Sequence, residues 1–409
     1  MNSRYGLFAR VTLPLAALNF INQASRTVMS IIGPVLAVEF SLSASELGLL
    51  AACMFAAYGL AQLPVGVALD LLGPRRVQAA FSLVAAAGFA VFALSDSFAG
   101  FAAARVILGV GVSAGLMAIL KANTQWFAPA QVAGMTGIAM AAASMGSVLT
   151  TAPVQAVLPT LGWRGVFWLL GGLSLSIALW IFLSVRDKPA PAARRGIRAE
   201  LAIMGAILGS RLFWRYGPAV VMLSILNFAY LGLWAGPWLR DVAGYDGPAR
   251  AQTLLLYTLG MLFGNMLTGL ASSRAQARGY PAIFVPALCM GGLLAAQAGL
   301  ALQPTGAAAI NILWVAFAFF ASGGAVGYVA LGQMFPPEQM GRVSTAANTL
   351  TLGGAFLLQS AIGWILDLWP RTAAGGWDPK GYTAALALSI AVQLFVVARL
   401  AGGRRLRRA

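Results

Sequence analysis

The sequence contains no histidine and only two cysteines, Cys53 and Cys289. Histidine and paired cysteines are common ligands of transition metals, and histidine is the most frequent acid–base catalyst. Because the two cysteines lie far apart within predicted helices, they offer neither a disulfide framework nor the spacing of a metal site. We therefore expect no metal and no other cofactor, and an integral-membrane enzyme is disfavoured.

Charged residues are also scarce, at 9% of the 409 residues, whereas hydrophobic residues make up 60%. Apolar runs of about 18 residues or more recur along the whole chain, and a helix of that length crosses a bilayer. This pattern predicts an all-α membrane protein with about twelve transmembrane helices. Their expected ranges are roughly 11–38, 45–69, 77–95, 99–122, 132–157, 164–185, 216–239, 250–272, 281–302, 308–332, 343–367 and 382–400.

The basic residues report topology rather than a nucleic-acid partner, although the net charge is +16. Twenty of the 27 Lys and Arg fall on one side of the twelve-helix arrangement. Such an excess marks the cytoplasmic side of a membrane protein. We therefore expect a multi-pass protein of the cell inner membrane, held in the lipid bilayer, with both termini cytoplasmic and residues 401–409 as a basic tail.

The predicted helices fall into two halves that resemble each other. Residues 186–215 carry a Pro/Ala linker, a basic cluster and a short amphipathic stretch, and they separate a bundle at 1–185 from a second bundle at 216–400. The tripeptide "LNF" occurs at 18–20 and again at 226–228, an offset of 208, and two other segment pairs repeat at offsets of 203 and 204. Parallel repeats of this kind are expected in a transporter whose two six-helix bundles rock about a central site.

The loop after the second predicted helix reads "GVALDLLGPRR" at 66–76, and the fourth predicted helix contains an arginine followed by two glycines. Both stretches resemble motifs of the major facilitator superfamily, a family of secondary transporters. The likeness is greatest to bacterial members with an arginine in helix 1, the pattern Y-x-x-x-Q-x-P-x-G in helix 2 and a lysine closing helix 4. The motif residues are Arg26, Tyr58, Gln62, Pro64, Gly66, Asp70, Gly73, Arg75, Arg76, Arg105, Gly109, Gly111 and Lys121.

The resemblance implies a gate at the cytoplasmic end of the bundles. Asp70 is expected to face the N-terminus of the eleventh predicted helix, at 343–367, and Arg75 or Arg76 is expected to bridge the two. This contact, called the latch, would hold the gate shut. The alternative is an ordinary turn whose arginines follow the positive-inside rule, but it does not explain the spacing of the aspartate and the glycines. Arg105 is expected to be structural, with a gating role left open by the motif.

One face of the first predicted helix is polar, with Asn19, Asn22, Gln23 and Arg26 within an arc of about 100°. Arg26 lies roughly 18 Å from the far helix end, too deep to reach water along its own side chain. All eleven acids lie in loops or at predicted helix ends. We therefore expect an anionic substrate to bind Arg26 through a carboxylate or phosphate. A structural arginine, held by a carboxylate or by helix carbonyls, is the alternative.

Further polar and aromatic residues are expected around the same central site. The offset of 208 transfers the polar arc of helix 1 to helix 7, where Trp234 stands opposite Arg26. Lys121 is equally compatible with a second cationic contact and with an interfacial anchor. The candidate substrate contacts are Asn19, Asn22, Gln23, Arg26, Tyr58, Gln62, Lys121, Asn227, Tyr230, Trp234, Asn348 and Gln359.

These observations predict a monomeric secondary transporter of a small organic anion, working by symport or antiport through alternating access. An efflux transporter of drugs or metabolites is the alternative, and a transporter-like sensor without flux is a more distant one. Proton-coupled transporters usually carry acids or histidines within the membrane, and none is predicted here. We therefore favour anion exchange, or symport in which the coupling ion is carried by the substrate, over a mechanism in which a protein group such as Glu39 carries the proton.

Overall fold

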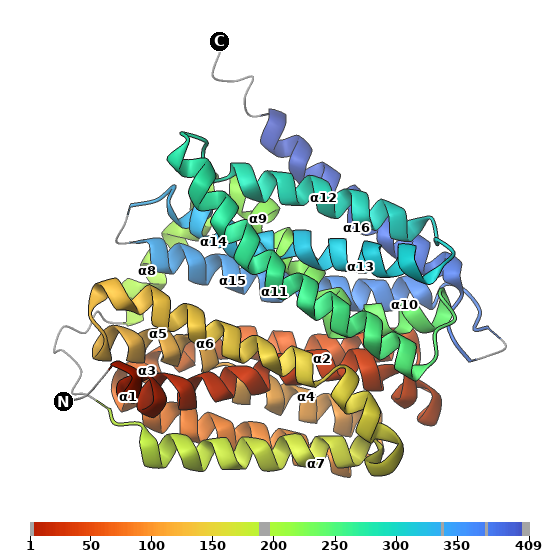
Figure 1. Ribbon diagram of the computed structural model, residues 1–409, viewed down its shortest axis with the longest axis horizontal. Coiled ribbons are helices and arrows are strands. Elements are labelled where there is room, and N and C mark those ends of the chain that lie inside the picture. Colours follow the sequence, from red (N-terminus) through yellow and green to blue (C-terminus); the bar gives the residue numbers. More distant parts are fainter. Residues whose placement is uncertain (1–3, 188–196, 337–338, 373–374, 403–409) are drawn as a thin grey trace. The chain divides into compact units, whose positions relative to one another are not determined.

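The computed structural model describes residues 4–187, 197–336, 339–372 and 375–402. These residues form helices joined by short connections (Figure 1), and within them the only extended pairing is an isolated bridge between Arg371 and Trp377. Ten helices of the described chain are long and apolar enough to cross a membrane. The all-α membrane class is confirmed. Residues 188–196 of the expected linker and 403–409 of the expected tail lie outside the described residues.

Contacts between the helices divide the chain into two compact units. Unit 1 comprises Met1–Leu42 and Leu49–Arg194, and unit 2 comprises Ser43–Gly48 and Arg195–Ala409. The segment Ser43–Gly48 is held in unit 2 by hydrogen bonds from its backbone. The N–H groups of Ala44 and Ser45 donate to the carboxylate of Asp367 at 2.9 and 2.8 Å.

The helices of unit 1 begin with a short helix and a π-helical turn, and α3 has its first residues in unit 2. They are α1 (Arg4–Leu7), η1 (Phe8–Thr12), α2 (Leu13–Glu39), α3 (Ala44–Leu94), α4 (Phe98–Val112), α5 (Gly115–Trp126), α6 (Pro129–Leu149) and α7 (Ala152–Ser184). The first of the predicted spans, α2, is not one of the ten helices that are apolar enough by composition to cross a membrane. Its asparagines, Gln23 and Arg26 lower its hydropathy.

The helices of unit 2 begin with the amphipathic stretch that the sequence places in the linker. They are α8 (Ile197–Gly209), α9 (Arg211–Ala229), η2 (Tyr230–Trp234), α10 (Ala235–Asp241), α11 (Gly247–Ala277), α12 (Phe284–Ala301), α13 (Ala307–Ala321), α14 (Gly323–Gly332), α15 (Met340–Leu366) and α16 (Pro379–Gly402). Helix α8 contributes Ile207 to a buried cluster with Phe213, Val221 and Val343. This apolar contact secures α8 to unit 2.

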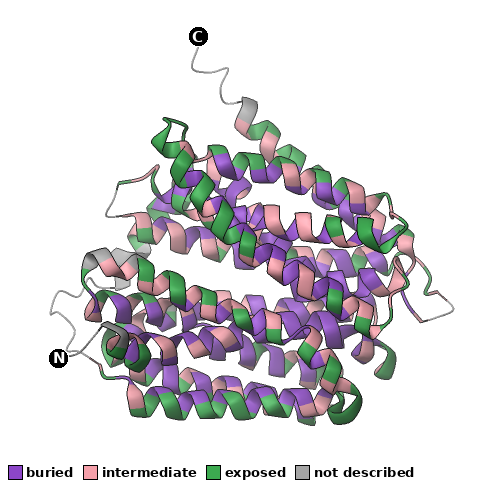
Figure 2. Cartoon of the chain, viewed as in Figure 1, coloured by how far each residue is buried: buried purple, intermediate pink, exposed green. Residues whose placement is uncertain are grey.

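The outer surface of the helices is apolar, as a lipid environment requires. Along α7, buried and exposed residues alternate around the helix (Figure 2), and the exposed ones include Leu169, Leu175, Leu179 and Leu183. In water such a stripe would favour aggregation, whereas in a bilayer it contacts acyl chains at no cost. The exposed leucines therefore mark a membrane-facing side of unit 1.

Two glycines form non-helical kinks within α3 and α7. Gly73, where φ is 81° and ψ is 163°, separates two helical segments of α3, and it lies between the predicted spans 45–69 and 77–95. The predicted span 132–157 ends early, at Leu149, and α7 contains a second kink at Gly162, where φ is 64°. At both bends φ is positive, a backbone conformation that glycine adopts far more readily than other residues.

The bend at Gly73 leads to a prediction about stability. Its φ and ψ lie in a region that is essentially restricted to glycine, and a Cβ there would lie 2.7 Å from Oδ1 of Asp187. Gly73→Ala should therefore destabilise the protein by about 1–3 kcal/mol, measured as a lower melting temperature in detergent. Gly66→Ala is the matched control, because nothing lies within 4 Å of a Cβ at Gly66. Equal melting temperatures for the two variants would contradict the prediction.

Candidate functional site

The polar face of α2 is partly accessible in the structure. Phe20, Gln23 and Arg26 are partly exposed, whereas Asn19 and Asn22 are buried. The spacing of three residues between Phe20, Gln23 and Arg26 places them along one side of the helix. Nδ2 of Asn22 donates to Oδ1 of Asn19 at 3.1 Å, and Nδ2 of Asn19 points to the sulfur of Met140 on α6 at 3.7 Å. The two asparagines thus join α2 to its neighbour and flank the accessible face.

Arg26 lies against two aromatic rings of α3. Its guanidinium carbon is 5.3 Å from the centroid of Phe55 and 5.1 Å from that of Tyr58, and both rings are buried. Cation–π contacts of this kind contribute about 0.5–2 kcal/mol each. Such contacts use the flat faces of a guanidinium, while a carboxylate binds its edge through two parallel N–H groups. The two rings therefore hold the Arg26 side chain against α3.

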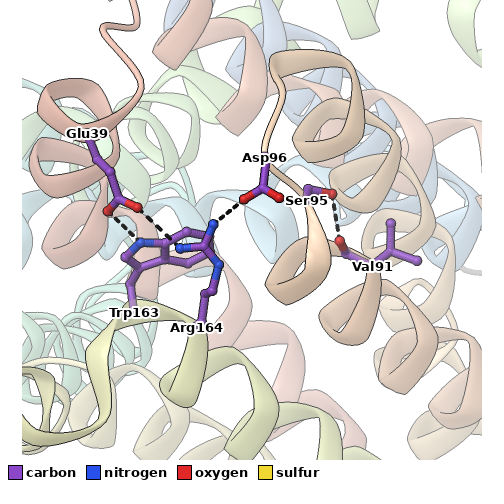
Figure 3. Close-up of polar contacts among 6 residues, drawn as sticks. All are labelled: Glu39, Val91, Ser95, Asp96, Trp163 and Arg164. Atoms are coloured by element: carbon purple, nitrogen blue, oxygen red, sulfur yellow. Dashed lines mark hydrogen bonds and ion pairs between the residues drawn. The ribbon is translucent and has the colours of Figure 1, made fainter.

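The acid at the end of α2 bonds to other groups of unit 1. Glu39 accepts hydrogen bonds from Nε1 of Trp163 at 2.8 Å and from Arg164 at 3.2 Å (Figure 3). Arg164 also forms an ion pair with Asp96 and stacks on Trp163, with 4.2 Å from its guanidinium carbon to the ring centroid. These contacts join the end of α2 to the bend in α7. Glu39 and Asp96 therefore act as structural acids of this cluster.

The predicted spans 99–122 and 308–332 correspond to two long apolar helical stretches, Phe98–Trp126 and Ala307–Gly332. Each contains a serine at a slight irregularity, Ser113 between α4 and α5 and Ser322 between α13 and α14, and the backbone of both serines stays right-handed helical. The difference between these positions is 322 − 113 = 209, close to the repeat offset of 208. In both, the serine hydroxyl donates to the carbonyl three residues earlier, at 2.6 Å in unit 1 and 2.5 Å in unit 2. Serine bonds of this kind bend helices.

Glutamines of α3 bond to backbone carbonyl groups near Ser113. Nε2 of Gln62 donates to the carbonyl of Ser113 at 3.3 Å, and Nε2 of Gln78 donates to the carbonyl of Gly115 at 3.2 Å. Gln62 follows Tyr58 by one helical turn, so the contacts to Ser113 and to Arg26 share one side of α3.

Lys121 lies at the motif loop, with Asp70. Its Nζ donates to Oδ1 of Asp70 and to the carbonyl of Leu69, both at 2.6 Å. The side chain of Lys121 is 21% exposed and that of Asp70 is 72% exposed, so water screens this ion pair. These contacts favour an anchoring role for Lys121, and the latch expected for Asp70 stays a prediction. Gly66 also lies in α3, and nothing lies within 4 Å of the position that a Cβ would take there.

Arg105 is buried inside unit 1. It is 1% exposed, and its guanidinium donates to the carbonyl of Leu50 at 3.2 Å and to that of Ser25 at 2.8 Å. One side chain of α4 thereby bonds to the backbones of α2 and α3. The expectation of a structural role agrees with this environment, because helix carbonyls satisfy the buried cation.

Unit 2 contains the other candidate contacts. Asn227 accepts a hydrogen bond from the hydroxyl of Tyr257 at 3.0 Å and points its Nδ2 to the sulfur of Met261 at 3.3 Å. Tyr230 is buried, with its ring centroid 5.1 Å from that of Phe317. Asn348 on α15 is partly exposed. Of these residues, Asn348 offers the most accessible polar group.

Trp234 and Gln359 pack into the interior of unit 2. Both are 0% exposed. Nε1 of Trp234 donates to the backbone carbonyl of Gln359 at 3.2 Å, and Nε2 of Gln359 donates to the carbonyl of Phe228 at 3.2 Å. Their polar groups hold α9 and η2 to α15, and the substrate contacts expected of both residues stay predictions. Trp234 is the last residue of the π-helical turn at Tyr230–Trp234, which the predicted spans do not include.

Solved structures share the fold of this chain. A bacterial homolog of the human lysosomal transporter Spinster, solved in an inward-facing and unoccupied conformation, has a TM-score of 0.79 and 19% identity. The alignment covers 98% of this chain and 96% of that one. A D-xylose–proton symporter has a TM-score of 0.74 and 15% identity over 94% of this chain and 96% of that one.

Curated relatives are transporters by name. The hexuronate transporter of Bacillus subtilis is 23% identical over 95% of this chain and 96% of its own length. The probable sulfoacetate transporter SauU of Cupriavidus necator is 25% identical over 63% of each chain. The probable L-galactonate transporter of Escherichia coli is 28% identical, with 41% of this chain and 37% of that protein aligned. The chain thus spans less than two thirds of these last two relatives.

The sequence profile of one family matches most of the chain, from residue 15 to residue 359. This match includes α2 with Arg26, the motif loop at Gly73, the helical stretches that contain Ser113 and Ser322, and most of α15. It agrees with the resemblance carried by the loop motif and with the helical fold. The protein belongs to the Major Facilitator Superfamily.

Proposed function

We propose that this protein is a secondary transporter that moves a small organic anion across the cell inner membrane by alternating access. The observation that carries the proposal is the position of Arg26, a guanidinium held against Phe55 and Tyr58 on the accessible side of α2. A cation at this depth in a membrane helix is a functional feature far more often than a structural one. The names of the relatives support an anion, since sulfoacetate, hexuronate and L-galactonate all carry an acidic group.

The surroundings of Arg26 favour an anion with a polar body. Gln23 lies beside Arg26 on the accessible side of α2, and the buried Asn22 lies one helical turn away. Hydroxyl groups of a substrate bond well to an accessible carboxamide such as that of Gln23, whereas a purely apolar body offers it no hydrogen-bond partner. We therefore place hydroxylated carboxylates first among the candidate substrates.

The proposal is tested by flux into proteoliposomes that contain the purified protein. Sulfoacetate, L-galactonate and a hexuronate serve as labelled anions, and an organic cation and a neutral sugar serve as controls. Uptake or counterflow of at least one anion, with no flux of the cation, is the expected result. Flux of the cation alone would indicate the drug-efflux alternative, and binding without any flux would indicate a sensor; either result would refute the proposal.

Glu39 should not carry the coupling proton. Its carboxylate is committed to Trp163 and Arg164, and a glutamine can keep the bond to Trp163. Because the Glu39 and Arg164 side chains are each 40% exposed, losing their ion pair should cost about 1 kcal/mol or less. Glu39→Gln should therefore change anion uptake and its pH profile by less than about twofold. Asp96→Asn, which removes the other acid on Arg164, is the control. A pH dependence lost only in Glu39→Gln would identify Glu39 as the proton carrier.

A further inference from the structure

Unit 1 contains a second cationic site, remote from Arg26 along the helices. A cavity of about 550 Å³ lies at the motif loop, where α3 bends, and is bordered by the ends of α5 and α7. Four basic and two acidic side chains line it, a balance of 4 − 2 = +2. The charged lining residues are Asp70, Arg75, Arg76, Lys121, Arg186 and Asp187.

Both acids of this cavity are already engaged by groups of unit 1. Asp70 pairs with Lys121 at 2.6 Å. Asp187 accepts a hydrogen bond from the backbone N–H of Arg75 at 2.9 Å and lies against Gly73 at the bend. Asp187 thereby caps the helical segment that starts after Gly73, as an acid at a helix N-terminus usually does. The acids are therefore occupied in holding the loop.

The arginines of the cavity carry its excess positive charge. Arg75 donates its Nε to the carbonyl of Phe182 at 2.9 Å and stacks on that ring at 4.5 Å, which fixes the side chain. Arg76 and Arg186 are exposed. None of these three arginines forms an ion pair with an acid in the described part of the chain. Three guanidinium groups around one cavity repel one another, and a bound anion would relieve that repulsion.

We infer that this cavity binds a phosphate group, in a site separate from the transport pathway at Arg26. Arginine is suited to phosphate because its planar fork donates two parallel hydrogen bonds. The positive-inside rule places the motif loop at the cytoplasmic surface. At the same mouth, Leu71 and Leu72 are 56% and 51% exposed, beside the arginines. The phosphate can therefore come from the headgroup of an anionic lipid, with its acyl chains on the leucines, or from a soluble phosphate.

The test compares two double variants of the full-length protein. Arg76→Gln/Arg186→Gln removes two charges from the cavity, and Arg274→Gln/Arg278→Gln removes two exposed charges from the corresponding loop of unit 2 as a control. Melting is followed in detergent with increasing inorganic phosphate, against chloride at equal ionic strength. In a second arm, melting is compared in nanodiscs of phosphatidylcholine with and without phosphatidylglycerol. If the cavity variant does not fold, Arg186→Gln alone takes its place.

Phosphate or phosphatidylglycerol should raise the melting temperature of the wild type and of the control variant. The cavity variant should need at least about tenfold more of that ligand for the same rise. A response to inorganic phosphate would assign the site to a soluble phosphate, and a response to phosphatidylglycerol alone would assign it to a lipid headgroup. Absence of stabilisation of the wild type in both arms would overturn the inference. So would an equal response of the cavity variant and the control.

Discussion

Replacing Arg26 with lysine is expected to lower kcat/KM for anion uptake by roughly 30- to 700-fold, corresponding to about 2–4 kcal/mol. Lysine keeps the positive charge but lacks the planar fork that bonds a carboxylate through two N–H groups. It also loses the flat faces that contact Phe55 and Tyr58 at 5.3 and 5.1 Å. Arg26→Gln should reduce uptake further, since no charge remains. Initial rates in proteoliposomes across a range of anion concentrations give the measurement.

Two controls separate this effect from a general loss of function. Arg278→Lys changes an exposed arginine of unit 2 and should leave uptake within about twofold of wild type. Tyr58→Phe retains the ring beneath Arg26, so its effect should be much smaller than that of Tyr58→Leu. If Arg26→Lys transported anions as well as the wild type, Arg26 would not be a bidentate anion contact.

Replacing Arg105 with leucine is expected to cause the largest loss of stability, about 3–5 kcal/mol. The buried guanidinium donates to the carbonyl groups of Ser25 and Leu50, so its removal takes away two charge-assisted hydrogen bonds between three helices. The change should appear as a melting temperature lower by roughly 6–20 °C, given the size of unit 1. It should also reduce the yield of folded protein.

Arg105→Lys distinguishes a structural role from a gating role. A single ammonium group can bond to one carbonyl more easily than to both, so this variant should recover part of the stability and most of the transport. A variant that melts like the wild type but does not transport would instead assign Arg105 to the gate. The melting curve in detergent and the uptake rate in proteoliposomes must therefore be measured on the same preparation.

The sequence was sufficient for the fold class and the family, because both depend on features that survive without coordinates. Apolar runs predict spanning helices, and the loop around Asp70 and Gly73 carries a specific motif. The polar arc of the first helix predicted Arg26 as a candidate contact from periodicity alone. Phe55 was not predicted as its partner, since a phenylalanine in an apolar run gives no sign of a cation nearby.

The sequence repeat predicts where helices run more directly than how each side chain packs. Ser113 and Ser322 differ by 209 positions, close to the repeat offset of 208, and that offset also gives Trp234 as a counterpart of Arg26, which stays a prediction. In the structure Trp234 bonds to the carbonyl of Gln359 inside unit 2. A repeat preserves where helices run and bend, but each side chain packs against its own neighbours. The π-helical turn at Tyr230–Trp234 changes the direction of the side chains after it, and a count of 100° per residue does not include it.

The most direct test of the account is the binding of an anion to the purified protein and to its Arg26→Gln variant, measured by isothermal titration. Sulfoacetate, L-galactonate and a hexuronate are titrated in turn, and an uncharged six-carbon sugar alcohol, which has the carbon skeleton of the two sugar acids, serves as the control ligand. We predict that the wild type binds at least one of these anions, that Arg26→Gln binds it at least about 30-fold more weakly, and that neither binds the alcohol. An unchanged Kd in Arg26→Gln would contradict the proposal that Arg26 binds the transported anion.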